Sequence, residues 1–98
     1  MIDQQSKANA FCSLHEQDKP FLIPNPWDAG SAKLLTNLGF KALATTSLGV
    51  SVSDGSLDTS AKRVLDNLKA ICAATDLPVN ADLENCFADE PAAAASMF

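Results

Sequence analysis

Apolar and polar positions recur along the chain with two different periods, and the changes of period divide it into elements. Over residues 6–17, Ala8, Phe11 and Cys12 recur at helical spacing, which predicts an amphipathic helix. The helix is expected to end before Pro20, because the residue before a proline is pushed out of the helical region. The chain therefore opens with a helix rather than a strand.

Three apolar runs further along are too short for helices and predict strands. These runs are Phe21–Pro24, Lys41–Thr46 and the alternating residues Val79, Ala81 and Leu83 in the stretch Leu77–Glu90. Helical patterns follow the runs at Ala29–Leu38, at Ala61–Cys72 and from Pro91 onward. The order is helix, then strand–helix three times, which predicts right-handed βαβ units and a parallel sheet.

Turn chemistry sets the expected ends of these elements. Asp28 is placed to cap the helix at 29–38, and Gly39 stands where a left-handed residue would end it. The Ser/Gly/Asp-rich segment Val50–Leu57 is expected to be a loop. Two interpretations of that loop stay open: its backbone N–H groups cradle an anion, or it is an ordinary strand-to-helix turn.

Composition restricts the class of protein. The 98 residues, 47% hydrophobic and 19% charged, suit one small globular domain. A net charge of −5 argues against nucleic acid or an anionic membrane surface as partner. Three cysteines without a C-x-x-C pair predict free thiols in a reducing compartment. With no signal-peptide pattern and no apolar run that would span a membrane, we expect a cytoplasmic protein.

Polar side chains gather where each predicted strand ends. The three groups are Asn25, Trp27 and Asp28, then Thr45, Thr46 and Ser47, then Asp82, Glu84 and Asn85. Because the carboxyl ends of parallel strands meet on one rim, we expect the groups to lie together. A carboxylate at the end of an apolar strand is costly unless it binds a cation or hydrogen-bond donors. Oxygen donors without a His–Cys constellation suit Mg²⁺ or Mn²⁺, with Asp58 at the start of a helix joining through water.

Two single residues have simpler explanations than catalysis. His15 lies in the last turn of its predicted helix, where a cation suits the helix dipole, so a structural role is favoured over a catalytic one. Asp28 is favoured as a helix cap rather than a catalyst. The chain has no Walker A motif, no G-x-G-x-x-G and no G-x-S-x-G.

The chain resembles the isocitrate lyase/phosphoenolpyruvate mutase superfamily in two stretches, FCSLHEQDKPFLIPNPWDAGSAKLLTNLGFKALATTSLGV and LPVNADLENCFADEP. Members of that superfamily open with a helix, then a strand reaching an N-x-W-D-x-x-S-A turn, then GF-x-A-(hydrophobic)-x-T. Their third strand ends in D-x-D-T-G or A-D-x-E-N-G. The resemblance runs from Phe11 to Pro91.

The resemblance implies a TIM-type (β/α)8 barrel that makes or breaks C–C or P–C bonds of α-oxo or carboxylic acids through an enolate, with Mg²⁺ or Mn²⁺ as cofactor. By position, Thr46, Ser47 and Leu48 would hold the carboxylate or phosphonate of a small substrate, and Trp27 would line the pocket mouth. Asp82 would be a metal-site carboxylate, with Asn80 beside it and Asp58 acting through water. Relatives of this kind are usually homo-oligomers.

Three departures from the superfamily pattern affect what we expect. Asn80 stands where many members have the first Asp of D-x-D, which removes one charge from the metal site. Cys86 stands where glycine is usual, so a positive φ there would cost roughly 1 kcal/mol. The third is length, because a complete barrel has about 250 residues.

We therefore expect residues 1–98 to be a single partial domain, the N-terminal helix and three βα units of an incomplete barrel. In the superfamily, a mobile catalytic loop and later Glu, Arg and His residues would follow this portion. The chain would then be inactive alone, and no catalytic residue is assigned within it. Two alternatives stay open: a self-contained small α/β module that binds a partner without catalysis, or a regulatory fragment that docks onto full-length homologues through its open sheet edge.

Overall fold

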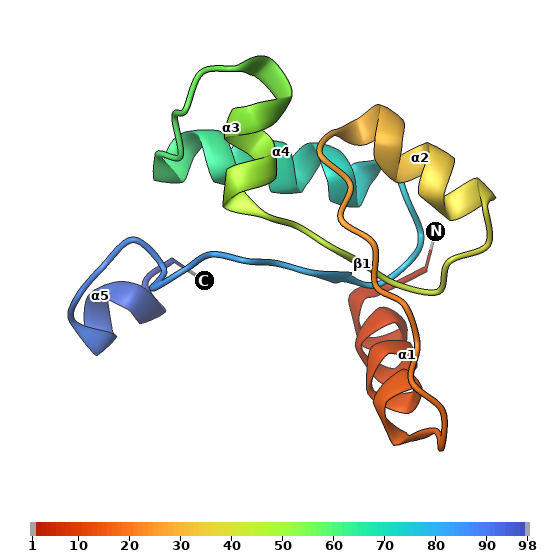
Figure 1. Cartoon of the computed structure of the whole chain (residues 1–98). Coiled ribbons are helices and arrows are strands. Elements are labelled where there is room, and N and C mark those ends of the chain that lie inside the picture. Colours follow the sequence, from red (N-terminus) through yellow and green to blue (C-terminus); the bar gives the residue numbers. More distant parts are fainter. Residues whose placement is uncertain (1, 98) are drawn as a thin grey trace.

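The computed structural model describes residues 2–97 and shows helices arranged around a small parallel sheet (Figure 1). The elements are α1 (Gln4–Glu16), α2 (Ala29–Asn37), β1 (Leu43–Ala44), α3 (Ser47–Asp54), α4 (Ala61–Ala73), β2 (Val79–Asn80) and α5 (Pro91–Ala95). Helices α2, α3 and α4 gather on one side of the strands, and α1 extends from the other side (Figure 1). The segment after β2 carries α5 away from the rest of the fold (Figure 1). The predicted α/β class is confirmed.

The core lies between the sheet and helices α2 and α4. Ala32 from α2, Leu43 from β1 and Ile71 from α4 are fully buried against one another. Leu35, Ala74, Leu77 and Val79 pack around them. Helix α1 contributes no buried residue, so its placement depends on weaker contacts than those of α2 and α4.

The two strands pair in parallel, with Leu43 opposite Val79 and Ala44 opposite Asn80. Both strands lie inside predicted runs but are shorter than predicted. At the end of β2 the N–H of Asp82 donates to the hydroxyl of Thr45 at 3.0 Å instead of to a strand carbonyl. This side-chain bond ends the regular ladder.

The strand predicted at Phe21–Pro24 is wrong, because this segment forms no regular strand. It still flanks β1, since the N–H of Ala44 donates to the carbonyl of Pro24 at 3.0 Å. Neither Pro24 nor Pro26 has an N–H to continue a ladder. The side-chain amide of Asn25 donates instead to the carbonyl of Ala44, at 2.7 Å. Asn25 thus satisfies a backbone group that a strand residue would normally satisfy.

The loop predicted over Val50–Leu57 is also wrong, because most of it belongs to helix α3. Gly55, at φ 72°, ends the helix in the left-handed conformation. The hydroxyls of Ser51 and Ser53 donate to carbonyls three residues earlier in the same helix, a bond that a serine can form without leaving the helical conformation. The serine-rich sequence has weak helix propensity, and tertiary contacts provide the missing stability. Val50 is 4% exposed, and the Arg63 guanidinium donates to the Val50 carbonyl at 3.2 Å.

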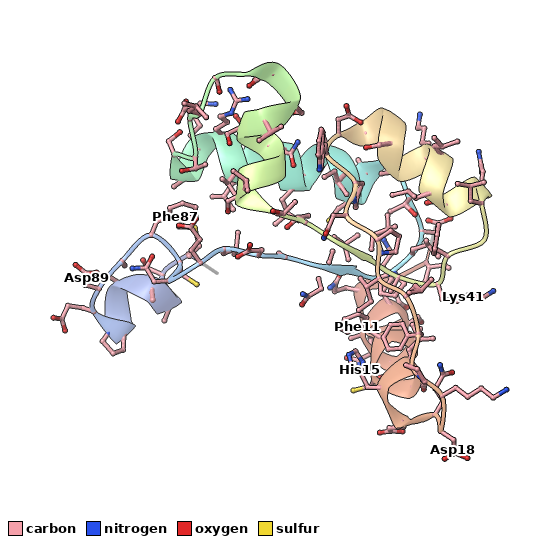
Figure 2. The ribbon with its side chains drawn as sticks, in the orientation of Figure 1. Phe11, His15, Asp18, Lys41, Phe87 and Asp89 are labelled. Atoms are coloured by element: carbon pink, nitrogen blue, oxygen red, sulfur yellow. The ribbon has the colours of Figure 1, made fainter. Side chains whose placement is uncertain are left out.

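The other helix ends follow the sequence closely. Asp28 caps α2 in a capping box with Ser31, and Gly39 follows α2 at φ 98°. Helix α1 begins two residues before the predicted start because Asp3 accepts a hydrogen bond from the N–H of Ser6. The structural role expected of His15 is supported. Its Nδ1 lies 2.8 Å from the carbonyl of Phe11, and its ring packs edge-on between Phe11 and Phe21 (Phe11 and His15 are labelled in Figure 2).

Within residues 2–97, no helix combines the length and the apolar character that crossing a bilayer requires.

Replacing Asn25 with Asp tests the bond to Ala44. The carboxylate cannot donate at pH 7, so the Ala44 carbonyl loses its partner and faces a negative charge. We expect the free energy of unfolding to fall by about 1–2 kcal/mol in urea titrations. The matched control is Asn37→Asp at the exposed end of α2, where the same change should cost at most about 0.5 kcal/mol through the helix dipole. Equal losses in the two variants would contradict the role given to Asn25.

Candidate functional site

The strand ends meet at one rim, which we define by Asn25, Thr45, Ser47 and Asp82. Thr45 accepts a hydrogen bond from the N–H of Asp82 at 3.0 Å. The hydroxyl of Ser47 donates to the carbonyl of Asp82 at 3.4 Å. Thr45 and Ser47 are 6% and 3% exposed, so these contacts are shielded from water. Residues far apart in sequence are therefore fixed together at the carboxyl ends of the two strands.

Trp27 lies beside this rim, against the first turn of α3. The backbone N–H of Trp27 donates to the hydroxyl of Ser31 at 2.9 Å, and its backbone carbonyl accepts from the side-chain amide of Asn67 in α4 at 2.8 Å. The indole ring faces Gly49, where a Cβ atom would come within 2.6 Å of the ring. With 43% of its surface exposed, Trp27 forms a wall that is open to solvent on one side.

The first turn of α3 combines a capped helix start with exposed and buried side chains. Thr46 is the N-cap, and its hydroxyl lies 3.5 Å from the N–H of Gly49. Ser47 is buried, whereas Leu48 is 67% exposed. The first backbone N–H groups of a helix have no partner inside the helix and carry its positive dipole end, so this turn has the chemistry to bind an anion.

The three candidate metal-site residues occupy different settings. Asp82 is exposed, and its Oδ1 accepts from the N–H of Glu84 at 3.1 Å. Asn80 is exposed two positions earlier, and side chains two apart on an extended strand project to the same face. The Oδ1 of Asp58 instead accepts from the N–H of Ser60 at 2.9 Å, at the start of α4. The structure records no contact that joins Asp58 to Asp82.

Asp82 and Asn80 fit Mg²⁺ or Mn²⁺ in donor chemistry, because both ions prefer oxygen ligands. Across residues 2–97, no three His, Cys, Asp or Glu side chains gather closely enough to hold a metal ion. Magnesium commonly binds through one or two carboxylates and takes its remaining ligands from water and substrate. The residues present therefore fit part of a magnesium site.

Asp28 behaves as the cap predicted for it. Its Oδ1 accepts from both the N–H and the hydroxyl of Ser31, each at 2.7 Å. These two hydrogen bonds favour the ionised form and lower the pKa of the Asp28 carboxyl below its ordinary value. The carboxylate stabilises the start of α2. It also fixes the turn at Trp27, because the same Ser31 hydroxyl accepts from the backbone N–H of Trp27.

Sequence reasoning missed two residues that position the first turn of α3. Gly49 permits the close approach of Trp27, and the glycine inside a Thr-Ser-Leu-Gly stretch was the available signal. Arg63 from α4 binds the other end of α3, donating to the Val50 carbonyl at 3.2 Å and forming an ion pair with Asp54. No sequence pattern distinguishes Arg63 from a solvent-facing basic residue.

The segment after Asp82 is strained. Glu84, Cys86 and Phe87 have φ angles of 53°, 59° and 59°, in the region that favours glycine. The turn is closed by the N–H of Cys86, which donates to the Leu83 carbonyl at 2.7 Å. The strain expected from Cys86 at a glycine position is therefore confirmed. Phe87 and Asp89 mark this segment beside α5 in Figure 2.

Comparison with known proteins identifies the family. The sequence profile of the phosphoenolpyruvate phosphomutase family matches residues 11–97, and the chain belongs to that family. The match covers the strand-end rim, the Trp27 turn and the first turn of α3. The predicted relationship to the isocitrate lyase/phosphoenolpyruvate mutase superfamily is thus confirmed.

Several relatives are much longer than this chain. Uncharacterized proteins from two strains of Mycobacterium tuberculosis, CDC 1551 / Oshkosh and ATCC 25618 / H37Rv, are each 40% identical over 88 residues, covering 88% of this chain and 34% of their own length. The crystal structure of a candidate lyase/mutase from Burkholderia cenocepacia J2315 is 47% identical with a TM-score of 0.88, covering 94% of this chain and 34% of that one. A candidate phosphonomutase from the same organism is 37% identical with a TM-score of 0.85, covering 93% and 37%. The chain spans about a third of the length of these proteins.

Substituting Gly49 with Ala tests the contact with Trp27. The added methyl would meet the indole ring and the Thr46 side chain at 2.6 Å, so the ring must move outward. We expect a loss of about 1–3 kcal/mol in unfolding free energy. The fluorescence of Trp27, the single tryptophan, should shift to the red and become easier to quench with acrylamide.

Gly30→Ala in α2 is the matched control. Its Cβ would lie 3.7 Å from the nearest atom, an ordinary contact, so alanine should stabilise the helix by about 0.5–1 kcal/mol. Unchanged tryptophan emission in the Gly49 variant would contradict the packing described for Trp27.

Replacing Cys86 with Gly tests the strained turn. Relief of a left-handed conformation is worth roughly 1–2 kcal/mol, and the extra chain entropy of glycine removes about 0.5–1 kcal/mol, which leaves a net stabilisation. Cys86→Ala retains Cβ and the strain, so it should show no gain in the same urea titration. If alanine stabilises the chain as much as glycine does, thiol packing rather than backbone strain is the cause.

Proposed function

We propose that the chain forms the N-terminal portion of a TIM-type barrel enzyme that makes or breaks C–C or P–C bonds in small carboxylic or α-oxo acids. Its family membership and the lyase/mutase descriptions of its structural neighbours support this reaction class. One observation carries the proposal further. The hydrogen bonds from Asp82 to Thr45 and from Ser47 to Asp82 place a carboxylate strand end beside a helix start suited to anions.

Each residue at this rim has a proposed task. The first turn of α3, formed by Thr46, Ser47 and Leu48, binds the carboxylate or phosphonate group of the substrate through its N–H groups and hydroxyls. Trp27 covers the bound group and limits the access of water. These contacts orient the substrate for reaction.

Asp82 and Asn80 are proposed as ligands for Mg²⁺ or Mn²⁺, with Asp58 acting through water. When bound, the ion supplies Lewis-acid stabilisation of the negative charge that develops on the substrate oxygen. Asn80 offers a neutral amide oxygen, so the site carries one charge fewer than a pair of carboxylates. We therefore expect the site to bind the ion less tightly than a D-x-D site would.

The groups that move protons are proposed to belong to the part of the fold that the longer relatives have beyond the matched third. Of the four residues that define the rim, only Asp82 has a side chain that ionises near neutral pH. We expect residues 1–98 alone to show no turnover of isocitrate-like or phosphonopyruvate-like substrates.

The proposal is tested in a chimera in which residues 11–97 replace the matched third of the Burkholderia cenocepacia candidate lyase/mutase. The chimera should process isocitrate-like or phosphonopyruvate-like substrates with Mg²⁺. Asp82→Asn and Ser47→Ala should each lower kcat/KM by on the order of 100-fold. Asp82→Asn should also raise the Mg²⁺ concentration needed for half-maximal activity.

Ser53→Ala is the control, because Ser53 is an exposed serine on the same helix. It should leave kcat/KM within about twofold. An inactive chimera beside an active parent enzyme would contradict the proposal, as would activity indifferent to Asp82→Asn. A folded chimera that binds substrate without converting it would favour a binding module.

A further inference from the structure

The carboxylate of Asp54 binds different partners through its two oxygens. Asp54 is the last residue of α3, and its Oδ2 forms an ion pair with the Arg63 guanidinium of α4. Its Oδ1 accepts a hydrogen bond from the N–H of Ser56 at 3.1 Å, on the far side of Gly55. Asp54 is therefore bound both to the next helix and to the segment that leads to that helix.

Arg63 has an anchor of its own besides Asp54. Its guanidinium also donates to the Val50 carbonyl at 3.2 Å, and its Nε is enclosed with no hydrogen-bond partner among residues 2–97. Val50 and Asp54 are four residues apart, so they lie one turn apart on the same face of α3, and one guanidinium reaches both. Because the Arg63 side chain is only 26% exposed, the cation that faces Asp54 has a restricted position.

Hydrogen bonds continue from Ser56 to Asp58. The N–H of Asp58 donates to the Ser56 hydroxyl at 3.2 Å, and the Oδ1 of Asp58 accepts from the N–H of Ser60 at 2.9 Å. Ser60 is the N-cap of α4, so these bonds form a continuous series from Asp54 to the helix that carries Arg63. The series fixes the Asp58 carboxylate through one oxygen and leaves its Oδ2 for a water molecule.

The connection between α3 and α4 (Figure 1) contains an unfavourable backbone conformation. Leu57 has φ 60°, in the left-handed region that disfavours residues with a side chain. The Leu57 side chain is 79% exposed, so its burial does not compensate for that conformation. A strained residue persists only where the surrounding contacts determine its conformation. Here the bond between Ser56 and Asp58 spans Leu57, and Asp54 holds Ser56.

The stability of α3 alone does not account for Asp54. A carboxylate at the last position of a helix lies at the negative end of the helix dipole, where it is unfavourable. The C-cap Gly55, at φ 72°, already ends α3 in the left-handed conformation. The contacts that favour a carboxylate here are those to Ser56 and Arg63, outside the helix.

We propose that Asp54 is a positioning residue for Asp58. Oriented by Arg63, it fixes the connection at residues 55–60, so that Asp58 presents its Oδ2 in one direction. The task of Asp58, to act on Mg²⁺ or Mn²⁺ through water, rests on the proposed function. The positioning itself requires neither metal nor substrate, so the two claims can fail separately.

Backbone amide exchange, measured by NMR on the full 98-residue chain, tests the positioning. Asp54→Ala should speed the exchange of the Asp58 and Ser60 N–H groups on the order of tenfold, because their hydrogen bonds open more often. The N–H of Ile71, in the buried part of α4, should stay within about threefold of its original rate, the effect of losing one ion pair near the surface. Asp54→Asn keeps an oxygen acceptor for Ser56 without the charge, so it should speed exchange less than Asp54→Ala does.

Asp66→Ala is the matched control. Asp66 is an exposed carboxylate of α4 that pairs with Lys62, so this substitution also removes one negative charge and one ion pair. It leaves the bonds of the connection intact, so the Asp58 and Ser60 amides should exchange as they do in the unsubstituted chain. Equal acceleration in the Asp54 and Asp66 variants would contradict the proposal.

Titration with Mn²⁺ alone tests whether Asp54 acts through Asp58. Bound Mn²⁺ broadens the NMR signals of nearby amides, including that of Asp82. Asp54→Ala and Asp58→Asn should each raise severalfold the Mn²⁺ concentration at which this broadening is half-maximal. The double variant should need no more Mn²⁺ than Asp58→Asn alone, because a residue that acts through another has no effect once the other is removed. Asp66→Ala again controls for the lost charge.

Three results would overturn the proposal. The first is unchanged exchange at Asp58 in the Asp54→Ala variant. The second is equal acceleration at Asp58 and Ile71, which would indicate a general loss of stability. The third is a Mn²⁺ effect of Asp54→Ala that adds to that of Asp58→Asn. If Mn²⁺ broadens no signal around Asp82 in the unsubstituted chain, the metal site of the proposed function is wrong, and the exchange rates alone decide the positioning.

Discussion

The parallel pairing of β1 with β2 is the constraint on which the rest of the structure depends. The bonds from Leu43 and Thr45 to the Pro78 and Asn80 carbonyls fix the register of two short strands. That register presents Leu43 to Ile71 and Ala32, so the helices α2 and α4 share one core with the sheet. It also places Thr45 within reach of Asp82, which creates the strand-end rim.

Helix α3 is stabilised by contacts with neighbouring elements more than by the helix propensity of its own residues. Trp27 packs against its first turn at Gly49, and Arg63 binds its last turn at Asp54. Since the proposed anion site is the first turn of α3, its position relative to Asp82 is set by contacts at both ends of the helix. Gly49 matters here for the space it leaves, because any side chain at that position would displace the indole ring.

Much of the architecture was predictable because local chemistry and tertiary structure agree. Asp28 and Gly39 mark the ends of α2 by capping chemistry, and the apolar period of α4 matches its buried face at Val64 and Ile71. The errors share a cause. Phe21–Pro24 has a strand's apolar run, but Pro24 and the following Pro26 offer no N–H to a ladder with β1. The serine-rich α3 is a helix because buried neighbours compensate for weak propensity.

The sequence by itself determined most of the element types, most of the caps, the family and the residues at the strand ends. Each of these is written in residue identity and short-range spacing. Tertiary structure alone decided that Thr45 and Ser47 bind the backbone of Asp82 and that Asn25 replaces the missing N–H of Pro26. The physical reason is that hydrogen bonds across 19 to 37 positions depend on the register of packed elements, and no local pattern encodes that register.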